Sequence, residues 1–204
     1  MPSGKQTETD RSGRAQGQAM PRAVGLLLLA VSISLFALVE MQLVRMSGLG
    51  FRLLLLICGG GLLLTGFAEL GRKNAYGSML TLGYGFFWLS LSALFYAPHG
   101  TLRVDNPQLL ASYVIMWGMF SSLLFLGALG KAYLLRTAMA SLAVYQFSFG
   151  ATLLSGRAGL QLVAGGFGLS CAWLFTVLAV VQVDNHLKLR RARLAKLGLS
   201  AEKP

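Results

Sequence analysis

Six long apolar stretches, each nearly free of charge, constrain this chain more than any other feature. They cover residues about 22–44, 52–70, 75–96, 108–129, 132–154 and 159–184. A helix needs roughly 20 apolar residues to cross a bilayer, and it satisfies its own backbone polar groups there. Only 12% of the residues are charged, about half the share of a soluble domain. The sequence therefore predicts an all-α, multi-pass protein of the cell membrane (inner or plasma) with six transmembrane helices.

The two ends of the chain differ from the apolar region between them. Residues 1–20 are polar and are expected to form a disordered arm, residues 21–186 the six-helix domain, and residues 187–204 a basic tail. The apolar run from Ala23 is too long for the h-region of a signal peptide, and no clear cleavage site follows it. The first apolar stretch is therefore predicted to be a transmembrane helix.

The positive charge predicts the orientation in the membrane. With both termini on one side, 14 of the 18 Lys and Arg residues lie on that side, and the other side holds Arg45, Arg52, Arg103 and Arg157. Cytoplasmic loops are enriched in Lys and Arg, so both termini are expected in the cytoplasm. The net charge of +11 is then a topology signal, which argues against nucleic acid as a partner.

The residues that usually carry catalysis or bind metals are scarce and dispersed. Cys58 and Cys171 both lie inside apolar stretches, and His99 and His186 lie near no cysteine or other histidine. No metal-ligand spacing and no nucleophile–base set can be assembled from them. The sequence predicts no enzyme, no catalytic residue, no metal and no cofactor.

Two glutamates lie near the ends of apolar stretches. A carboxylate near the membrane is expensive and is a functional candidate by default. Glu69 is the candidate for proton coupling, although a pair with Arg72 or Lys73 one turn away is the favoured alternative. For Glu40 the favoured interpretation is a pair with Arg45 near the membrane surface.

Tyr84 and Trp88 lie four residues apart and therefore share a helix face, together with Gly77 and Thr81. Such a face can line a pore, where a tyrosine hydroxyl supplies a weak polar site in an apolar constriction. Aromatic packing, or a place in an interfacial aromatic belt for Trp88, is the alternative interpretation. Both interpretations stay open for this face.

Small residues recur at helical spacing in the last two apolar stretches. The fifth has Ala138, Ser141, Tyr145, Ser148 and Thr152, and the sixth has Gly165, Gly168, Ala172, Thr176 and Ala179. Small residues let helices approach closely in lipid, so tight helix contacts are favoured over a substrate path. The basic segment 188–196 can continue the sixth helix and contact anionic lipid headgroups, or serve only as a topology anchor.

The most specific pattern is Gly66-x-x-Glu69-x-x-x-x-Asn74-x-x-Gly77-x6-Tyr84-Gly85-x-Phe87-Trp88. It resembles the corresponding segment of the acetate uptake transporter family, six-helix membrane proteins that move acetate or succinate, often with protons. Trp117-Gly118-x-Phe120 with Gly127 is similar to the family's fourth helix, and Gly165-x-x-Gly168-Leu169-x-Cys171 to its sixth. The likeness extends from about Pro21 to His186.

The chain departs from the family pattern at several polar positions. Where the family opens its first helix with Asn-Pro-Ala-Pro-Leu-Gly-Leu, this sequence has Met-Pro-Arg-Ala-Val-Gly-Leu at 20–26. A glutamine usual in helix 2 corresponds to Leu62, a tyrosine of helix 6 to Val177, and a late glutamate to Gln182. These differences indicate a divergent member.

The resemblance implies a membrane conduit, passive or proton-coupled, for small monocarboxylates such as acetate, with succinate as a further substrate. It also implies a ring-like homo-oligomer, a hexamer, and a hydrophobic constriction formed by Leu29, Tyr84 and Leu142. Asn74, Ser141 and Trp88 complete the expected pathway, and Tyr84, Asn74 and Ser141 are the expected donors to the carboxylate. The alternative is a scaffold or accessory protein that keeps the fold and transports nothing, which the lost polar positions favour.

Overall fold

The computed structural model describes residues 4–95 and 107–196, and within these ranges it contains six helices and no strand. Side chains are described for 21–95, 107–157, 159–188 and 191–192. The helices are α1 (Gly4–Glu40), α2 (Gly48–Gly71), α3 (Ala75–Leu94), α4 (Pro107–Gly127), α5 (Tyr133–Ser155) and α6 (Ala158–Lys196). All six are long and apolar enough to cross a membrane, as the sequence predicts. The loop expected at 97–107 lies outside the described residues except for Pro107, which begins α4.

Local residue choices fix where several helices begin and end. Ser47 caps α2 by accepting a hydrogen bond from the Gly50 amide at 3.1 Å. Gly156 ends α5 with a φ of 64°, a left-handed conformation that suits glycine. The first transmembrane helix ends at Glu40 rather than near the predicted residue 44, because Gln42 is also left-handed, with a φ of 59°.

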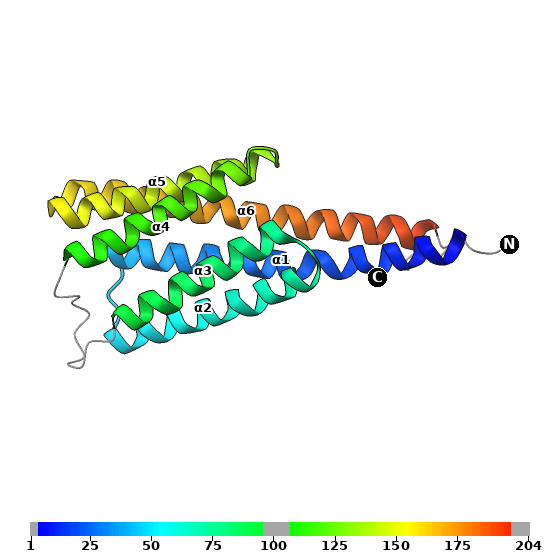
Figure 1. Ribbon diagram of the computed structural model, residues 1–204, viewed down its shortest axis with the longest axis horizontal. Coiled ribbons are helices and arrows are strands. Elements are labelled where there is room, and N and C mark those ends of the chain that lie inside the picture. Colours follow the sequence, from blue (N-terminus) through cyan, green and yellow to red (C-terminus); the bar gives the residue numbers. More distant parts are fainter. Residues whose placement is uncertain (1–3, 96–106, 197–204) are drawn as a thin grey trace.

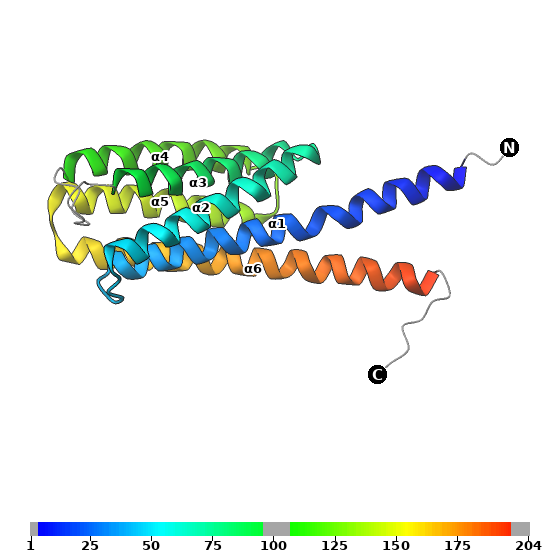
Figure 2. The same cartoon turned by 90° about the horizontal axis from the view of Figure 1, so that it is seen from below.

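Helices α1 and α6 are longer than the membrane requires. The chain is helical from Gly4, where its polar composition predicts a disordered arm, and α6 continues through the basic segment to Lys196. Residues 4–20 contain no proline and several good helix formers, and the helix continues through Pro21 into the membrane span. Figure 2 shows both extensions projecting beyond the bundle at the same end. The start of α1 and the end of α6 therefore lie on one side, as six spans require.

The helices form a ring rather than two separate layers. Helix α1 packs against α6 and α2, α2 packs against α3, and α5 packs against both α4 and α6 (Figure 1). The ring is loosest between α3 and α4, where the backbones approach least and aromatic side chains span the gap. There Phe87 stacks on Tyr113 at 5.8 Å between ring centroids, and Tyr84 lies 6.3 Å from Trp117.

Small residues bring the backbones of neighbouring helices together. A Cβ on Gly66 of α2 would lie 2.9 Å from the backbone nitrogen of Leu82 of α3, and one on Gly168 of α6 would lie 2.9 Å from the Cβ of Ala37 of α1. Neither position has room for a larger side chain. At Gly168, the stripe of small residues in the sixth helix forms a tight helix contact, the interpretation favoured from the sequence.

Candidate functional site: a cavity at the centre of the ring

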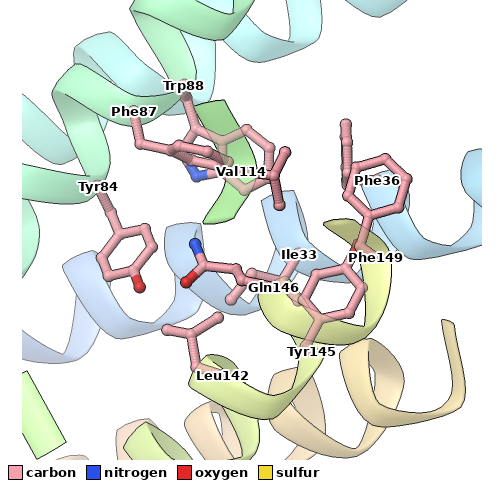
Figure 3. A pocket seen from close by; sticks show the side chains of 10 residues that line it. All are labelled: Ile33, Phe36, Tyr84, Phe87, Trp88, Val114, Leu142, Tyr145, Gln146 and Phe149. Carbon is pink, nitrogen blue, oxygen red and sulfur yellow. The ribbon is translucent and has the colours of Figure 1, made fainter. Parts of the chain in front are cut away.

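A small cavity lies inside the ring, and four helices contribute to its wall (Figure 3). Its volume is about 10 Å³, close to the least that holds one water molecule. Most of the wall is aromatic or aliphatic. The lining residues are Ile33, Phe36, Tyr84, Phe87, Trp88, Val114, Leu142, Tyr145, Gln146 and Phe149.

Helical periodicity explains why these residues converge. The lining residues of α5 are spaced at i, i+3, i+4 and i+7, and those of α3 at i, i+3 and i+4, so each set forms one face of its helix. Phe36 of α1 lies between the two faces, with ring centroids 5.5 Å from Trp88 and 5.4 Å from Phe149, both in edge contacts. Such edge contacts favour defined ring orientations and hold the wall in shape.

A chain of buried polar side chains crosses one side of the cavity. The hydroxyl groups of Tyr84 and Ser121 are hydrogen-bonded to each other, and Ser121 also donates to Oε1 of Gln146. The same Ser121 hydroxyl lies 2.8 Å from the backbone oxygen of Trp117 on its own helix. Tyr84, Ser121 and Gln146 are each at most 3% exposed. These hydrogen bonds link α3, α4 and α5 and fix the orientation of the Gln146 amide.

Two nitrogen donors at the cavity are not used by the surrounding protein. Nε1 of Trp88 is buried, and no described residue accepts a hydrogen bond from it. Figure 3 shows the amide oxygen of Gln146 turned toward Tyr84 and its nitrogen turned toward the indole of Trp88. No hydrogen bond from this amide nitrogen to the described part of the chain is found either. A buried donor without an acceptor is costly, so the indole nitrogen of Trp88 is the most unusual polar atom of the wall.

The opposite side of the cavity connects to Glu40 at the end of α1. The hydroxyl of Tyr145 donates to Oε2 of Glu40 at 3.0 Å, and the side-chain amide of Gln161 donates to the Glu40 backbone oxygen. The other carboxylate oxygen, Oε1, is buried and lacks a hydrogen-bond partner in the described chain. Glu40 thus contacts α5 and α6. Its carboxylate is bound by Tyr145 and not by Arg45, the partner favoured from the sequence.

Glu69 and Asn74 lie together at the turn between α2 and α3. The Asn74 amide nitrogen donates to Oε2 of Glu69, and its oxygen accepts from the Gly77 amide at 3.2 Å, which caps α3. Arg72 lies 3.8 Å from Oε1 of Glu69, one of the two pairs that the favoured alternative proposed. Asn74 precedes Tyr84 by ten residues, about 15 Å along the helix axis. Neither Glu69 nor Asn74 lines the cavity.

The remaining predicted pathway residues divide into two groups. Tyr84, Trp88 and Leu142 line the cavity. Leu29 is fully buried on α1, one turn before Ile33, but does not reach the wall. Ser141 points to α6, where its hydroxyl lies 3.4 Å from the backbone oxygen of Phe167. The aromatic face of α3 is therefore at the cavity, and Ser141 belongs to a helix contact.

The sequence interpretation missed Gln146 and Ser121. Gln146 is the one amide side chain of α5, and an amide in the middle of an apolar span is a functional signal by itself. Ser121 carries no comparable signal, because a hydroxyl in a membrane helix commonly bonds to the backbone one turn earlier. Among the residues whose side chains are described, no group of three or more His, Cys, Asp or Glu could hold a metal ion.

The sequence matches one known protein family over most of its length. The model of the GPR1/FUN34/yaaH family matches residues 6–188, most of the chain. The chain belongs to the GPR1/FUN34/yaaH family. The resemblance to acetate transporters inferred from the motif at 66–88 is thereby confirmed, and the chain is a multi-pass protein of the cell membrane.

Individual members of the family agree with this assignment over most of their length. The succinate-acetate/proton symporter SatP of Escherichia coli strain K12 is 28% identical over 169 residues, which cover 82% of this chain and 90% of that protein. An uncharacterized protein of Methanothermobacter thermautotrophicus is 32% identical over 128 residues, 58% of this chain and 63% of the relative. The solved structure of the bacterial acetate channel SatP superimposes with a TM-score of 0.75 at 27% identity, covering 82% of this chain and 93% of that one.

Proposed function

We propose that this protein is a conduit through which a small monocarboxylate such as acetate crosses the membrane, with succinate as a further candidate. The observation that carries the proposal is the cavity at the centre of the ring, whose apolar wall includes the unpartnered indole nitrogen of Trp88 and, facing it, the amide of Gln146. The similarity to a succinate-acetate/proton symporter and to an acetate channel supports the substrate class. An apolar constriction with few donors suits a small anion with a methyl group.

The side chains that narrow this conduit are Tyr84 of α3 and Leu142 of α5, which both line the cavity (Figure 3). With a volume of about 10 Å³ the cavity is too small for acetate, so passage requires side chains of the wall to rotate. Leu142 is suited to this because its side chain has no hydrogen bond to break. Tyr84 is held by Ser121, and its hydroxyl therefore sets the shape of the constriction.

Uptake of radiolabelled acetate into proteoliposomes, with and without an inward proton gradient, tests the proposal. Wild-type protein should show saturable uptake, and Tyr84→Ala should change its rate about tenfold or more by opening the constriction. Tyr76→Phe is the matched control, because Tyr76 lies on the same helix but bonds to the Leu124 backbone oxygen at 2.9 Å, away from the cavity. Absence of uptake above empty liposomes from folded protein would contradict the conduit and leave the scaffold alternative.

The proton gradient separates symport from passive flow. For symport we propose Glu69 as the coupling acid, as the sequence suggests. The residue is only 2% exposed and lies at the end of α2, on the side where α1 and α6 extend beyond the bundle. Glu69→Gln should then abolish the dependence of uptake on the proton gradient and leave gradient-free uptake in place. If flow is passive, acetate uptake should depend neither on the proton gradient nor on Glu69→Gln.

The assembly and its surroundings form part of the same proposal. The acetate channel similarity supports a homo-oligomer, for which we propose a hexamer with cytoplasmic termini and anionic lipid around the basic end of α6. Exposed Lys188 and Arg191 lie on this end, and each basic residue near an anionic surface contributes about 1 kcal/mol. Native mass spectrometry from anionic nanodiscs measures both subunit number and retained lipid; a monomer without lipid would contradict this part.

A further inference from the structure

We propose that Trp88 and Gln146 form a two-donor site that binds one carboxylate oxygen of the substrate at the centre of the conduit. The inference rests on the proposed transport function and adds to it the binding groups and the charge state of the substrate. Nε1 of Trp88 and Nε2 of Gln146 are the donors. The substrate is then held as the anion rather than as the neutral acid.

Trp88 supplies the first donor from a rigid position. Its side chain is 1% exposed, and its ring packs edge-on against Phe87 at 4.6 Å and against Phe36 at 5.5 Å between centroids. The indole nitrogen has no acceptor in the part of the chain that the structure describes. An indole nitrogen can only donate, so an acceptor that completes this site must come from a bound molecule.

Gln146 supplies the second donor, and the polar chain beside it sets the direction of its amide. Ser121 occupies the amide oxygen, and Tyr84 in turn contacts the Ser121 hydroxyl. With the oxygen committed to that side, the amide nitrogen faces the indole of Trp88 across the cavity (Figure 3). Two donors that face each other need an acceptor between them.

The chemistry of the remaining wall decides which acceptor fits. The hydroxyl of Tyr145 is turned to Glu40, and the other lining residues apart from Tyr84 are apolar. An ionised carboxylate only accepts hydrogen bonds, so its oxygen matches two N–H groups, and such charge-assisted bonds are stronger than neutral ones. A carboxylic acid would also bring a donor of its own, for which the pair offers nothing. The methyl group of acetate then lies against the apolar wall.

Indole NMR on the intact protein in nanodiscs tests the inference directly. The chain has three tryptophans, so 15N-indole labelling gives three N–H signals, which Trp117→Phe and Trp173→Phe assign by elimination. Sodium acetate should shift the Trp88 signal in a saturable way, whereas equal sodium chloride should not. The Trp173 signal is the internal control because this side chain is 67% exposed on the outer face. Gln146→Leu should raise the acetate concentration for half-saturation about tenfold.

Each result either supports the two-donor site or overturns it. A saturable Trp88 shift that Gln146→Leu weakens supports it. An unmoved Trp88 signal in protein that still transports acetate would overturn the two-donor site and leave the transport proposal intact. That result is expected if the Gln146 amide oxygen faces Trp88 and already accepts the indole hydrogen. A shift that Gln146→Leu does not change would remove Gln146 from the site and equally overturn it. Loss of both transport and shift would mean that the proposed function itself is wrong.

Discussion

The two glutamates at the ends of transmembrane helices are held in different ways. Glu69, at the end of α2, has both of its partners within five residues along the chain, Arg72 and Asn74. Glu40, at the end of α1, accepts its hydrogen bond from Tyr145, which is 105 residues away on α5 and lines the cavity. The first carboxylate is tied to a turn, and the second is tied to the wall of the proposed conduit.

This difference, rather than burial, predicts which property each glutamate substitution changes first when no proton gradient is present. Glu69 is 2% exposed, yet its contacts account for the α2–α3 turn: it holds Asn74, and Asn74 caps α3. A change at Glu69 should therefore affect the stability of the helix pair first. A change at Glu40 releases a hydroxyl of the cavity wall and should affect the conduit first.

The largest effect on stability is expected from Glu69→Ala. The substitution removes the acceptor of the partly buried Asn74 amide and the partner of Arg72, and losing a hydrogen bond to a charged group costs about 2–3 kcal/mol. Unfolding by SDS in mixed micelles measures the loss. Glu69→Gln keeps an acceptor for Asn74 and should lose less than half as much. Equal stability of Glu69→Ala and wild type would show that the turn does not depend on this carboxylate.

Glu40→Ala is expected to destabilise the protein less, by about 1–2 kcal/mol, because one hydrogen bond of a buried hydroxyl is lost. Its effect on acetate uptake should be the larger of the two glutamate substitutions in the absence of a proton gradient. The matched variant Tyr145→Phe removes the same hydrogen bond from the other side and should change uptake in the same direction. If gradient-free uptake responds to Glu69→Ala and not to Glu40→Ala, the roles of the two carboxylates are the reverse of those argued above.

A smaller effect, about 1 kcal/mol, is expected from Gly77→Ala. A Cβ at this position would contact the amide nitrogen of Asn74 and lie 2.8 Å from Oε2 of Glu69, so it would push the two partners apart. Gly60→Ala is the control, since a Cβ there meets no atom within 4 Å. Thermal unfolding in detergent should rank Gly77→Ala below wild type and Gly60→Ala at or above it. The opposite order would show that the turn accommodates a Cβ at position 77 without loss of stability.

Much of the fold was accessible from the sequence, because hydropathy alone determines which segments cross a membrane. All six spans were predicted. The largest differences are the extensions of α1 back to Gly4 and of α6 on to Lys196, and α1 ends before residue 44 because Gln42 is left-handed. The spacing of Tyr84 and Trp88 also predicted that they share one helix face, which lines the cavity. The helical state of residues 4–20 could not be predicted from the sequence, since a polar composition does not reveal that the helix of the neighbouring span continues into them.

The contacts of the site could be predicted less well, because they depend on how helices rotate against one another. Nothing local indicates that Ser121 of α4 lies between Tyr84 and Gln146. Asn74 was expected to donate to the substrate, and its amide nitrogen also donates to Glu69, a contact between two residues that were considered separately. For Glu40, proximity in sequence favoured Arg45, whereas the packing of α1 against α6 and α5 determines its partners.

The most direct test of the central claim, a carboxylate path through this cavity, is chemical block at its narrowest point. Leu142→Cys places a thiol in the cavity wall, while the native cysteines Cys58 and Cys171 are buried, at 3% and 0% exposed. A small anionic methanethiosulfonate reagent should label Cys at 142 and stop acetate uptake in proteoliposomes, with acetate slowing the labelling and wild-type protein unaffected. Uptake that continues at the wild-type rate after complete labelling would contradict a path through this cavity.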